Sequence, residues 1–277
     1  MKNDKFSAVW LSHSSLKDFI TCPRLYFLRA VYKDPLTGNK ITQVTAPLTL
    51  GQVVHDTIDS ISALPADTRM DTPLISKFQS LWSEVTGERG GFKSPVEEKQ
   101  YKDLGVAMIE RIMAHPGPLL EKAIKIKEEL PHYWFNEAEG FILCGKIDWL
   151  IYKEQTDSVH ILDFKTGKRE EDDDSLQLPI YHLLVKNTQN REVTGASYWY
   201  LQKSDTPVEK PLPETTRAAD EIMSIARRMK LARQLAHFTC QSGNSEGCRH
   251  CAPLEAIKNG KGKKVGQSKM RQDIYIL

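Results

Sequence analysis

Apolar residues recur every three to four positions over much of the first 115 residues, a spacing that places them on one face of an α-helix. Leu16, Phe19 and Ile20 follow this spacing, and the serines before Leu16 are typical of a helix N-terminus. Pro23 suits the first turn of a second helix, which we expect to end near Tyr32. The same pattern predicts further helices over 51–61, 73–85 and 95–114.

Strand patterns begin after residue 115. Residues 124–130 alternate between apolar and charged side chains, and residues 141–152 and 159–164 are rich in β-branched and aromatic side chains. Together these segments predict an antiparallel meander. A helix, a strand and a long amphipathic helix are then expected over 173–185, 197–201 and 214–237.

This order of elements predicts one α/β domain. The 277 residues contain no internal repeat or low-complexity linker, so we expect a single domain over 1–277. Its parts are a helical part over 1–115, a core over 116–210 and a C-terminal part over 211–277. The last part contains a run rich in lysine and glycine, 258–271, which we expect to be a solvated tail, with a phosphate-contacting arm as the alternative.

Composition and charge exclude a membrane protein and leave most other classes open. Hydrophobic residues make up 40% of the chain and charged residues 27%, which is ordinary for a globular protein. No stretch approaches the roughly 20 apolar residues of a membrane span, and the first residues lack the features of a secretory signal. We therefore expect a cytoplasmic protein without a membrane partner. Because the net charge is only +2, any nucleic-acid surface must be a local patch.

Two carboxylates and a lysine form the most informative pattern. Asp163 and Lys165 lie two apart in a predicted strand, so they share one face while Phe164 points into the core. Asp148, on the preceding strand, can meet them across the ladder. Such carboxylates can bind Mg²⁺ or Mn²⁺ for phosphodiester hydrolysis, in which the lysine orients or helps to deprotonate a water. An isolated pair of this kind is more often an exposed ion pair.

Other residues support the pattern. Gln177 and Tyr181 lie four apart on the next predicted helix and therefore share a face. Upstream, His55 lies on a predicted helix, although a single histidine is more often structural than a ligand. The acidic run 170–174 is interpreted as the solvated N-terminus of a helix, where the macrodipole favours negative charge.

The combination of these motifs resembles the RecB-like branch of the PD-(D/E)XK nuclease superfamily. The resemblance runs from about residue 11 to residue 251, and it is carried in order by Leu11–Pro23, Gly51-x-x-x-His55, Gly145-x-Ile147-Asp148, Asp163-x-Lys165-Thr166-Gly167 and Gln177-x-x-x-Tyr181. It implies a restriction-endonuclease-like core, a mixed sheet with an antiparallel meander flanked by helices. An N-terminal helical region and a C-terminal cysteine loop would complete this fold.

The resemblance also implies a function and a set of roles. The chain would be a metal-dependent DNA exonuclease that acts on single strands or ends in recombination, repair or CRISPR adaptation. Metal ligands would be His55, Asp148, Asp163 and the Phe164 carbonyl, with Lys165 catalytic and with Gln177 and Tyr181 bracing the site and contacting DNA. A further acid would be Glu128 or Glu129, of which we favour Glu129. The imidazole would make the site accept Mn²⁺ readily.

Cysteines form a second candidate site. Cys240, Cys248 and Cys251 lie close together in the sequence, with Gly243 and Gly247 allowing the loop to wrap. Clustered cysteines in an intracellular protein indicate a metal or catalysis. Three thiolates need a fourth ligand, and the candidates are Cys22, His237 and His250.

The resemblance points to Cys22 as this fourth ligand. Relatives such as the AddB nuclease domain and the CRISPR-adaptation RecB-like exonuclease use one N-terminal and three C-terminal cysteines around a 4Fe–4S cluster, and Cys22 matches the N-terminal position. The close pair comes last here, unlike in those relatives, and structural Zn²⁺ is the alternative cofactor. Cys144 lies in a predicted central strand and is expected to be a core residue.

Two other functions fit the same residues. One is a nuclease-like DNA-binding module that assembles with a helicase or an integrase, and the other is a zinc-stabilised DNA-binding protein without catalysis. The combination of Asp148, Asp163 and Lys165 favours the enzyme, because a scaffold has no need to keep like charges together.

Overall fold

A computed structural model describes residues 4–126, 128, 130–244, 246–268 and 270–277. The chain forms two compact units, neither of which is one continuous segment. We call Ala46–Tyr133 with Cys144–Thr215 the middle unit. The terminal unit consists of Met1–Thr45, Trp134–Leu143 and Thr216–Leu277. The prediction of one domain in three sequential parts stays a prediction.

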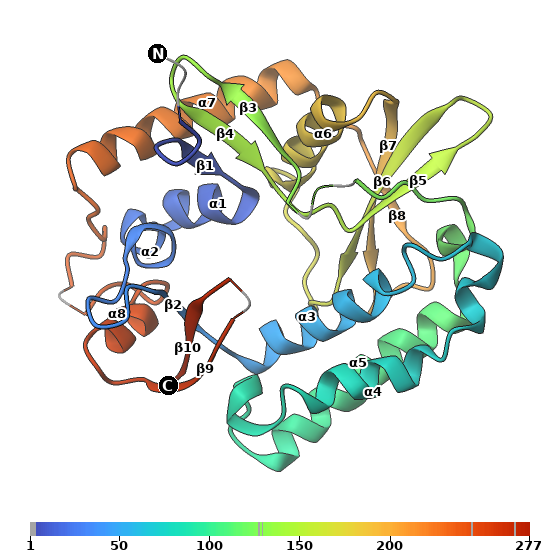
Figure 1. The fold of residues 1–277 in the computed structure, drawn as a ribbon, viewed down its shortest axis with the longest axis horizontal. Helices are drawn as coiled ribbons and strands as arrows, with labels where there is room; N and C mark the ends of the chain where they lie inside the picture. The colour runs from blue at the N-terminus through green and yellow to red at the C-terminus, as the bar shows by residue number, and fades with distance from the viewer. Residues whose placement is uncertain (1–3, 127, 129, 245, 269) are drawn as a thin grey trace. The chain divides into compact units, whose positions relative to one another are not determined.

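The middle unit contains a mixed four-stranded sheet (Figure 1). Its strands, in spatial order, are β5 (Trp149–Lys153), β6 (Ser158–Lys165), β7 (Glu192–Tyr200) and β8 (Val208–Lys210). The pairs β5–β6 and β7–β8 are antiparallel, whereas β6 and β7 are parallel. Parallel strands need a crossover, and α6 (Gln177–Thr188) provides it. The predicted α/β class with a mixed sheet is confirmed.

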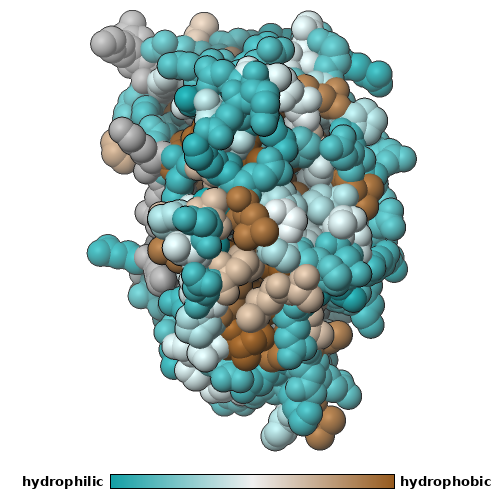
Figure 2. Space-filling view, turned by 90° about the vertical axis from the view of Figure 1, so that its right-hand side faces the viewer, coloured by the Kyte–Doolittle hydropathy of each residue, from teal (hydrophilic) through white to brown (hydrophobic). Residues whose placement is uncertain are grey.

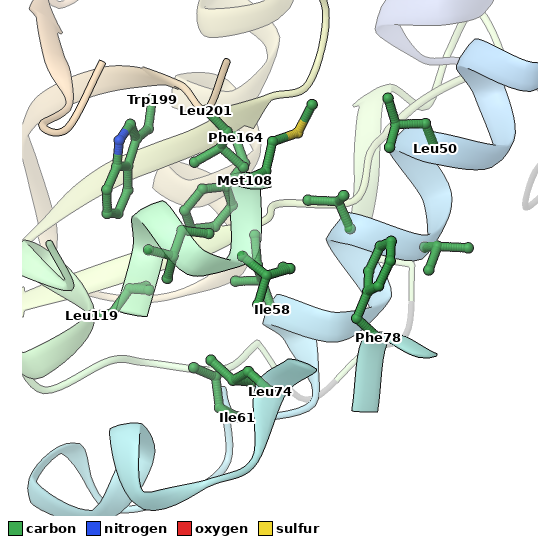
Figure 3. Close-up of a cluster of buried hydrophobic side chains, with 14 of the residues drawn as sticks. Leu50, Ile58, Ile61, Leu74, Phe78, Met108, Leu119, Phe164, Trp199 and Leu201 are labelled. Carbon is green, nitrogen blue, oxygen red and sulfur yellow. The ribbon is translucent and has the colours of Figure 1, made fainter. Parts of the chain in front are cut away.

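Three helices cover one face of this sheet. They are α3 (Ala46–Asp59), α4 (Leu74–Ser83) and α5 (Pro95–Ala114), which pack against one another (Figure 1). Their apolar residues form one core with Phe164 and Trp199 of the strands (Figure 3). The Phe164 and Trp199 rings lie 5.9 Å apart between centroids. The prediction that Phe164 points into the core is therefore confirmed.

The opposite face of the sheet carries the polar residues of β6. Because side chains alternate along a strand, Asp163 and Lys165 face away from the core that holds Phe164. Helix α6 lies on this second face, since Gln177 donates a hydrogen bond to Asp163. A Cβ atom on Gly145 would lie 2.9 Å from Leu184 Cδ1, so the glycine permits the close approach of α6.

The segment before the sheet differs from the prediction. The described residues of 124–130 form no strand, and only the neighbouring Ala123 makes an isolated bridge, to Ile151. Ile124, Lys125 and Ile126 instead line a cleft. Three short 3₁₀ helices complete this unit: η2 (Ala66–Asp71), η3 (Gly87–Gly90) and η4 (Gly117–Leu120).

The terminal unit contains a second sheet and most of the remaining helices. The sheet has the order β1 (Val9–Leu11), β4 (Phe141–Cys144) and β3 (His132–Asn136), with β1 parallel to β4. The helices are α1 (His13–Thr21), α2 (Pro23–Tyr26), the π-helical turn η1 (Phe27–Val31), α7 (Thr215–Gln234) and α8 (Ala252–Lys258). Ser12 caps α1 by accepting a hydrogen bond from the Ser15 backbone, and Pro23 begins α2, so both predicted helix starts are confirmed.

The lysine-rich C-terminus forms a hairpin, so the prediction of a solvated tail is wrong. Strands β9 (Lys263–Gln267) and β10 (Gln272–Ile276) pair with each other, and β10 also pairs with β2 (Lys40–Gln43). The fully buried Asp273 explains this structure. Its Oδ1 lies 2.7 Å from Lys264 Nζ and accepts a hydrogen bond of 3.2 Å from Asn39, so the buried charge requires the ordered hairpin.

Hydrophilic side chains cover most of the face drawn in Figure 2, interrupted by smaller apolar patches. Isolated apolar residues on a surface are normal and indicate no function by themselves. Within the described part of the chain, none of the helices combines the length and the apolar composition of a membrane span.

Candidate active site and cysteine cluster

Asp148 and Asp163 are brought together by the antiparallel pair β5–β6. The register pairs Trp149 with Leu162, so Asp148, one residue before β5, lies next to Asp163. Oδ2 of Asp148 accepts a hydrogen bond of 3.0 Å from the Phe164 backbone N–H. Asp163 is 3% exposed. Two carboxylates therefore lie side by side in a buried setting, as the sequence predicted.

The two carboxylates have different electrostatic environments. Burial raises the pKa of Asp163 to about 7, and the charge of Asp148 adds to this shift. Burial acts in the same direction on Asp148, but the charge and hydrogen bond of His55 hold the pKa of Asp148 below its ordinary value. Neighbouring buried acids that differ in this way are typical of functional sites.

One oxygen of Asp163 fits a cation. Its buried Oδ2 forms an ion pair of 2.9 Å with Lys165 Nζ, and no other partner of this oxygen is found among the described residues. Buried carboxylate oxygens are normally satisfied, and carboxylates are the oxygen ligands that Mg²⁺ and Mn²⁺ prefer. The residues at this position therefore suit a divalent cation.

His55 reaches the site from α3. Its Nδ1 lies 3.2 Å from Asp148 Oδ1, and its ring meets the Phe164 ring edge-on at 6.3 Å. Gly51, one turn earlier, allows this approach, because a Cβ atom there would lie 3.2 Å from Thr166 Oγ1. In the described residues His55, Asp148 and Asp163 do not form a group as tight as the thiols described below.

Gln177 connects the other predicted residues through one amide. Its Oε1 accepts a hydrogen bond from the Lys165 ammonium. Its Nε2 donates to Asp163 Oδ1 at 3.1 Å and to the Tyr181 hydroxyl at 3.1 Å. The structure thus brings together the residues of the D-x-K and Q-x-x-x-Y motifs, as the resemblance implied.

Glu171 is a site residue that the sequence interpretation missed. The acidic run was expected to begin a solvated helix, but α6 begins only at Gln177, and the Glu171 side chain is 16% exposed. Its Oε2 lies 3.5 Å from Lys165 Nζ. Glu171 differs from the other acids of the run in its burial and in its contact with Lys165, and no periodicity in the sequence signals either.

The further acid was predicted at Glu128 or Glu129. Glu129 lies outside the described residues, so its role stays a prediction. Glu128 forms an ion pair of 3.3 Å with His132 and lines a cleft of about 400 Å³. Asp148, Lys146 and Asp59 line the same cleft. Asp148 therefore borders this cleft.

Residues 10–255 match the sequence profile of the PD-(D/E)XK nuclease superfamily, whose name describes the carboxylate–lysine motif found at this site. The chain belongs to this superfamily. The comparison with curated proteins gave no match. Membership indicates a nuclease that hydrolyses phosphodiester bonds, and nucleases of this superfamily typically use Mg²⁺ or Mn²⁺. The prediction of the superfamily is confirmed.

This PD-(D/E)XK protein also contains a group of four cysteines. Sγ atoms of Cys22, Cys240, Cys248 and Cys251 all lie within 4.8 Å of one another. Cys22 lies at the junction of α1 and α2, and Cys251 precedes α8. Cys22 therefore completes the set of four, as the resemblance implied. Cys144 is a buried residue of β4 outside this group, as expected.

The loop around the cysteines is shaped by glycines. Gly243 and Gly247 have φ angles of 66° and 86°, which favour glycine. A Cβ atom on Gly247 would lie 2.5 Å from Cys251 Sγ, so no other residue fits there without a shift. The hydroxyl and backbone of Ser242 lower the pKa of Cys240 to about 6, which favours the thiolate that binds metals.

The sulfur spacing bears on the metal. Cys248 Sγ and Cys251 Sγ lie 3.8 Å apart. A single tetrahedral ion, about 2.3 Å from each sulfur, separates neighbouring sulfurs by about 3.8 Å. A 4Fe–4S cluster places an iron under each cysteine sulfur and holds the sulfurs further apart. The described geometry therefore suits a metal, and its compact spacing matches a single ion.

Proposed function

We propose that this protein is a RecB-like, metal-dependent DNA exonuclease that acts on single strands or on DNA ends. The observation that supports the proposal is the buried Asp163, whose two oxygens face different partners. Oδ1 accepts a hydrogen bond from Gln177, while Oδ2 has no hydrogen-bond partner within the described residues. Oδ2 also lies 2.9 Å from the Lys165 ammonium, and a buried carboxylate beside a second carboxylate and a lysine is typical of a functional site.

The proposed roles are those that the resemblance implies. His55, Asp148, Asp163 and the Phe164 carbonyl would hold Mg²⁺ or Mn²⁺. A divalent cation bound there supplies Lewis acidity toward the phosphodiester. Lys165 would orient the attacking water, and its ammonium would stabilise negative charge that develops on the phosphate.

Gln177 and Tyr181 would support this chemistry from α6. The Gln177 amide holds Lys165 and Asp163 in one arrangement, so that both are positioned before DNA binds. The Tyr181 hydroxyl completes the hydrogen bonds of that amide. Gln177 and Tyr181 are 8% and 9% exposed, so their contact with DNA rests on the resemblance alone.

The test is digestion of single- and double-stranded DNA, labelled at the 5′ or the 3′ end, with Mg²⁺, Mn²⁺ or EDTA. Lys165→Met is the test variant, and Lys168→Met, an exposed lysine three residues later, is its control. We expect a ladder of products shortened from one end with the native protein and the control. Lys165→Met should lower the rate by about 100- to 10,000-fold.

Other results would revise the proposal in defined ways. Internal cuts in circular DNA would overturn the exonuclease assignment. Cleavage that persists in Lys165→Met would overturn the active site. Binding of DNA without cleavage under either metal would favour an assembly module that acts with a helicase or an integrase.

We infer that the four cysteines hold a structural metal centre. The resemblance implies a 4Fe–4S cluster, whereas the compact sulfur spacing favours a single Zn²⁺. Absorption spectra and metal analysis after anaerobic purification separate these centres. Iron with sulfide and a brown colour supports the cluster, one zinc per chain supports the ion, and absence of both would overturn the centre.

A further inference from the structure

We propose that Glu171 is a positioning residue that holds the Lys165 ammonium in place when Asp163 binds a divalent cation. This inference rests on the proposed metal site at Asp148 and Asp163. It gives a function to one member of an acidic run that otherwise looks like an ordinary solvated loop. The observation that carries it is the convergence of two carboxylates on one ammonium.

The surroundings of Lys165 show why a second carboxylate matters. Its Nζ lies 2.9 Å from Asp163 Oδ2 and 3.5 Å from Glu171 Oε2. The Gln177 amide oxygen accepts a hydrogen bond from it, and the Tyr198 ring centroid lies 4.6 Å away. The Lys165 side chain is only 15% exposed, so protein groups rather than water neutralise most of its charge.

Glu171 is itself fixed in position. The Ser175 hydroxyl donates a hydrogen bond of 2.7 Å to its Oε1, and its backbone N–H donates to the Tyr200 hydroxyl at 3.2 Å. The Ser175 hydroxyl also accepts a hydrogen bond from the backbone of Gln177. A chain of contacts therefore runs from Glu171 through Ser175 to Gln177, which binds Lys165.

The electrostatic need arises with the metal. Without a cation, Asp163 can neutralise Lys165 by itself. A divalent cation on Asp163 would draw on the same negative charge and would repel the ammonium, since both are positive and close. Glu171 supplies a carboxylate that faces Lys165, so the ammonium keeps an anionic partner while Asp163 serves the metal.

The neighbouring acids contact other groups. Glu170 lies 3.6 Å from Lys203 Nζ with 64% of its side chain exposed. Asp173 lies 3.7 Å from Lys210 Nζ with 99% of its side chain exposed. They share the sequence context and charge of Glu171 but contact other lysines. Glu170→Gln and Asp173→Asn are therefore matched controls.

The experiment is a double-mutant cycle on the full chain, with Mn²⁺ affinity as its first measurement. Titration calorimetry would compare the native protein, Glu171→Gln, Lys165→Met and the double variant. We expect Glu171→Gln to weaken Mn²⁺ binding about tenfold, because Lys165 then competes for Asp163. In the Lys165→Met background the same substitution should change Mn²⁺ affinity less than twofold.

Kinetics provide the second measurement. Glu171→Gln should lower kcat with an unchanged KM for DNA, and Glu171→Asp should recover part of the loss. The Glu170→Gln and Asp173→Asn controls should match the native protein in both measurements.

Three results would overturn the inference. Equal weakening of Mn²⁺ binding in both backgrounds would show that Glu171 acts on the metal directly. Identical behaviour of Glu171→Gln and Glu170→Gln would show that it has no special role. Unchanged Mn²⁺ binding in the Asp163→Asn variant would instead refute the metal site of the proposed function. This failure would be visible before any Glu171 variant is measured.

Discussion

The carboxylate–lysine site of the middle unit and the cysteine cluster of the terminal unit are built in different ways. Asp163 and Lys165 belong to strand β6, where hydrogen bonds to both neighbouring strands hold the backbone. Two of the four cysteines, Cys240 and Cys248, lie in the loop between α7 and α8, which turns at glycines with positive φ. One site depends on a regular element and the other on a loop.

The two sites are expected to affect the stability of the fold in opposite directions. The strand holds Asp163 next to Asp148 although the two carboxylates repel each other. Burial raises the pKa of Asp163 most, and the charge of Asp148 raises it further. Such an arrangement lowers stability and is retained for function. The thiols have the opposite character, because a bound metal would stabilise the loop that carries them. Removing one residue should therefore affect activity in the first site and stability in the second.

The largest effect should come from Asp163→Asn. We expect cleavage to fall at least about 100-fold, because the proposed metal ligand beside Lys165 is lost. In metal-free protein, the same substitution should raise the melting temperature by a few degrees, on the order of 1 kcal/mol, because two buried carboxylates no longer repel each other. Nuclease assays and calorimetry in EDTA would measure the two effects.

Asp157→Asn is the control for this comparison. Asp157 is 71% exposed and pairs with Arg191 at the surface, so its loss should leave cleavage unchanged. A lower melting temperature for Asp163→Asn would contradict the view that repulsion between the two carboxylates destabilises the protein. It would show instead that the contact with Lys165 dominates.

A smaller effect on activity, with a large effect on metal content, is expected for Cys22→Ser. The variant removes one of four thiols, so bound metal should be lost and the protein should melt at a lower temperature. Cys144→Ser changes another buried cysteine outside the cluster, and its metal content should equal that of the native protein. The measurement is the metal content of both variants. Equal metal content in Cys22→Ser and Cys144→Ser would show that Cys22 is not a ligand.

The smallest effect is expected for alanine substitutions at two glycines of the cysteine loop, measured as metal occupancy. Gly247→Ala would place a methyl group 2.5 Å from Cys251 Sγ, so metal occupancy should fall. Gly243→Ala meets nothing within 4 Å and carries only the strain of its positive φ, about 1 kcal/mol. Equal occupancy in the two variants would show that backbone strain, rather than crowding of the sulfur, governs the loop.

Local periodicity accounts for what could be predicted. Helix α5 spans Pro95–Ala114 as predicted. Pro95 suits its first turn, and Met108, Ile109 and Ile112 lie on one buried face. Period-two alternation also placed Asp163 and Lys165 on one face and Phe164 on the other. The i, i+4 spacing likewise placed Gln177 beside Tyr181.

Short elements with distant partners could not be predicted in this way. Strands β1 and β2 have three and four residues, too few for a pattern, and form only because β4 and β10 pair with them. The lysine-rich C-terminus looked like a tail because β10 pairs with the distant β2, and Asn39, one partner of the buried Asp273, lies 234 residues earlier. The segment 124–130 alternates as a strand does, but its residues Ile124, Lys125 and Ile126 line a cleft.

By itself, the sequence determined the acids, the lysine and the thiols available for chemistry, and the faces of the local elements that carry them. Only the tertiary structure decided which acid of the run 170–174 meets Lys165, and that Cys22 reaches the C-terminal thiols. The physical reason is range. Side-chain direction within one element follows from backbone geometry, whereas a contact between distant segments depends on how the whole chain packs.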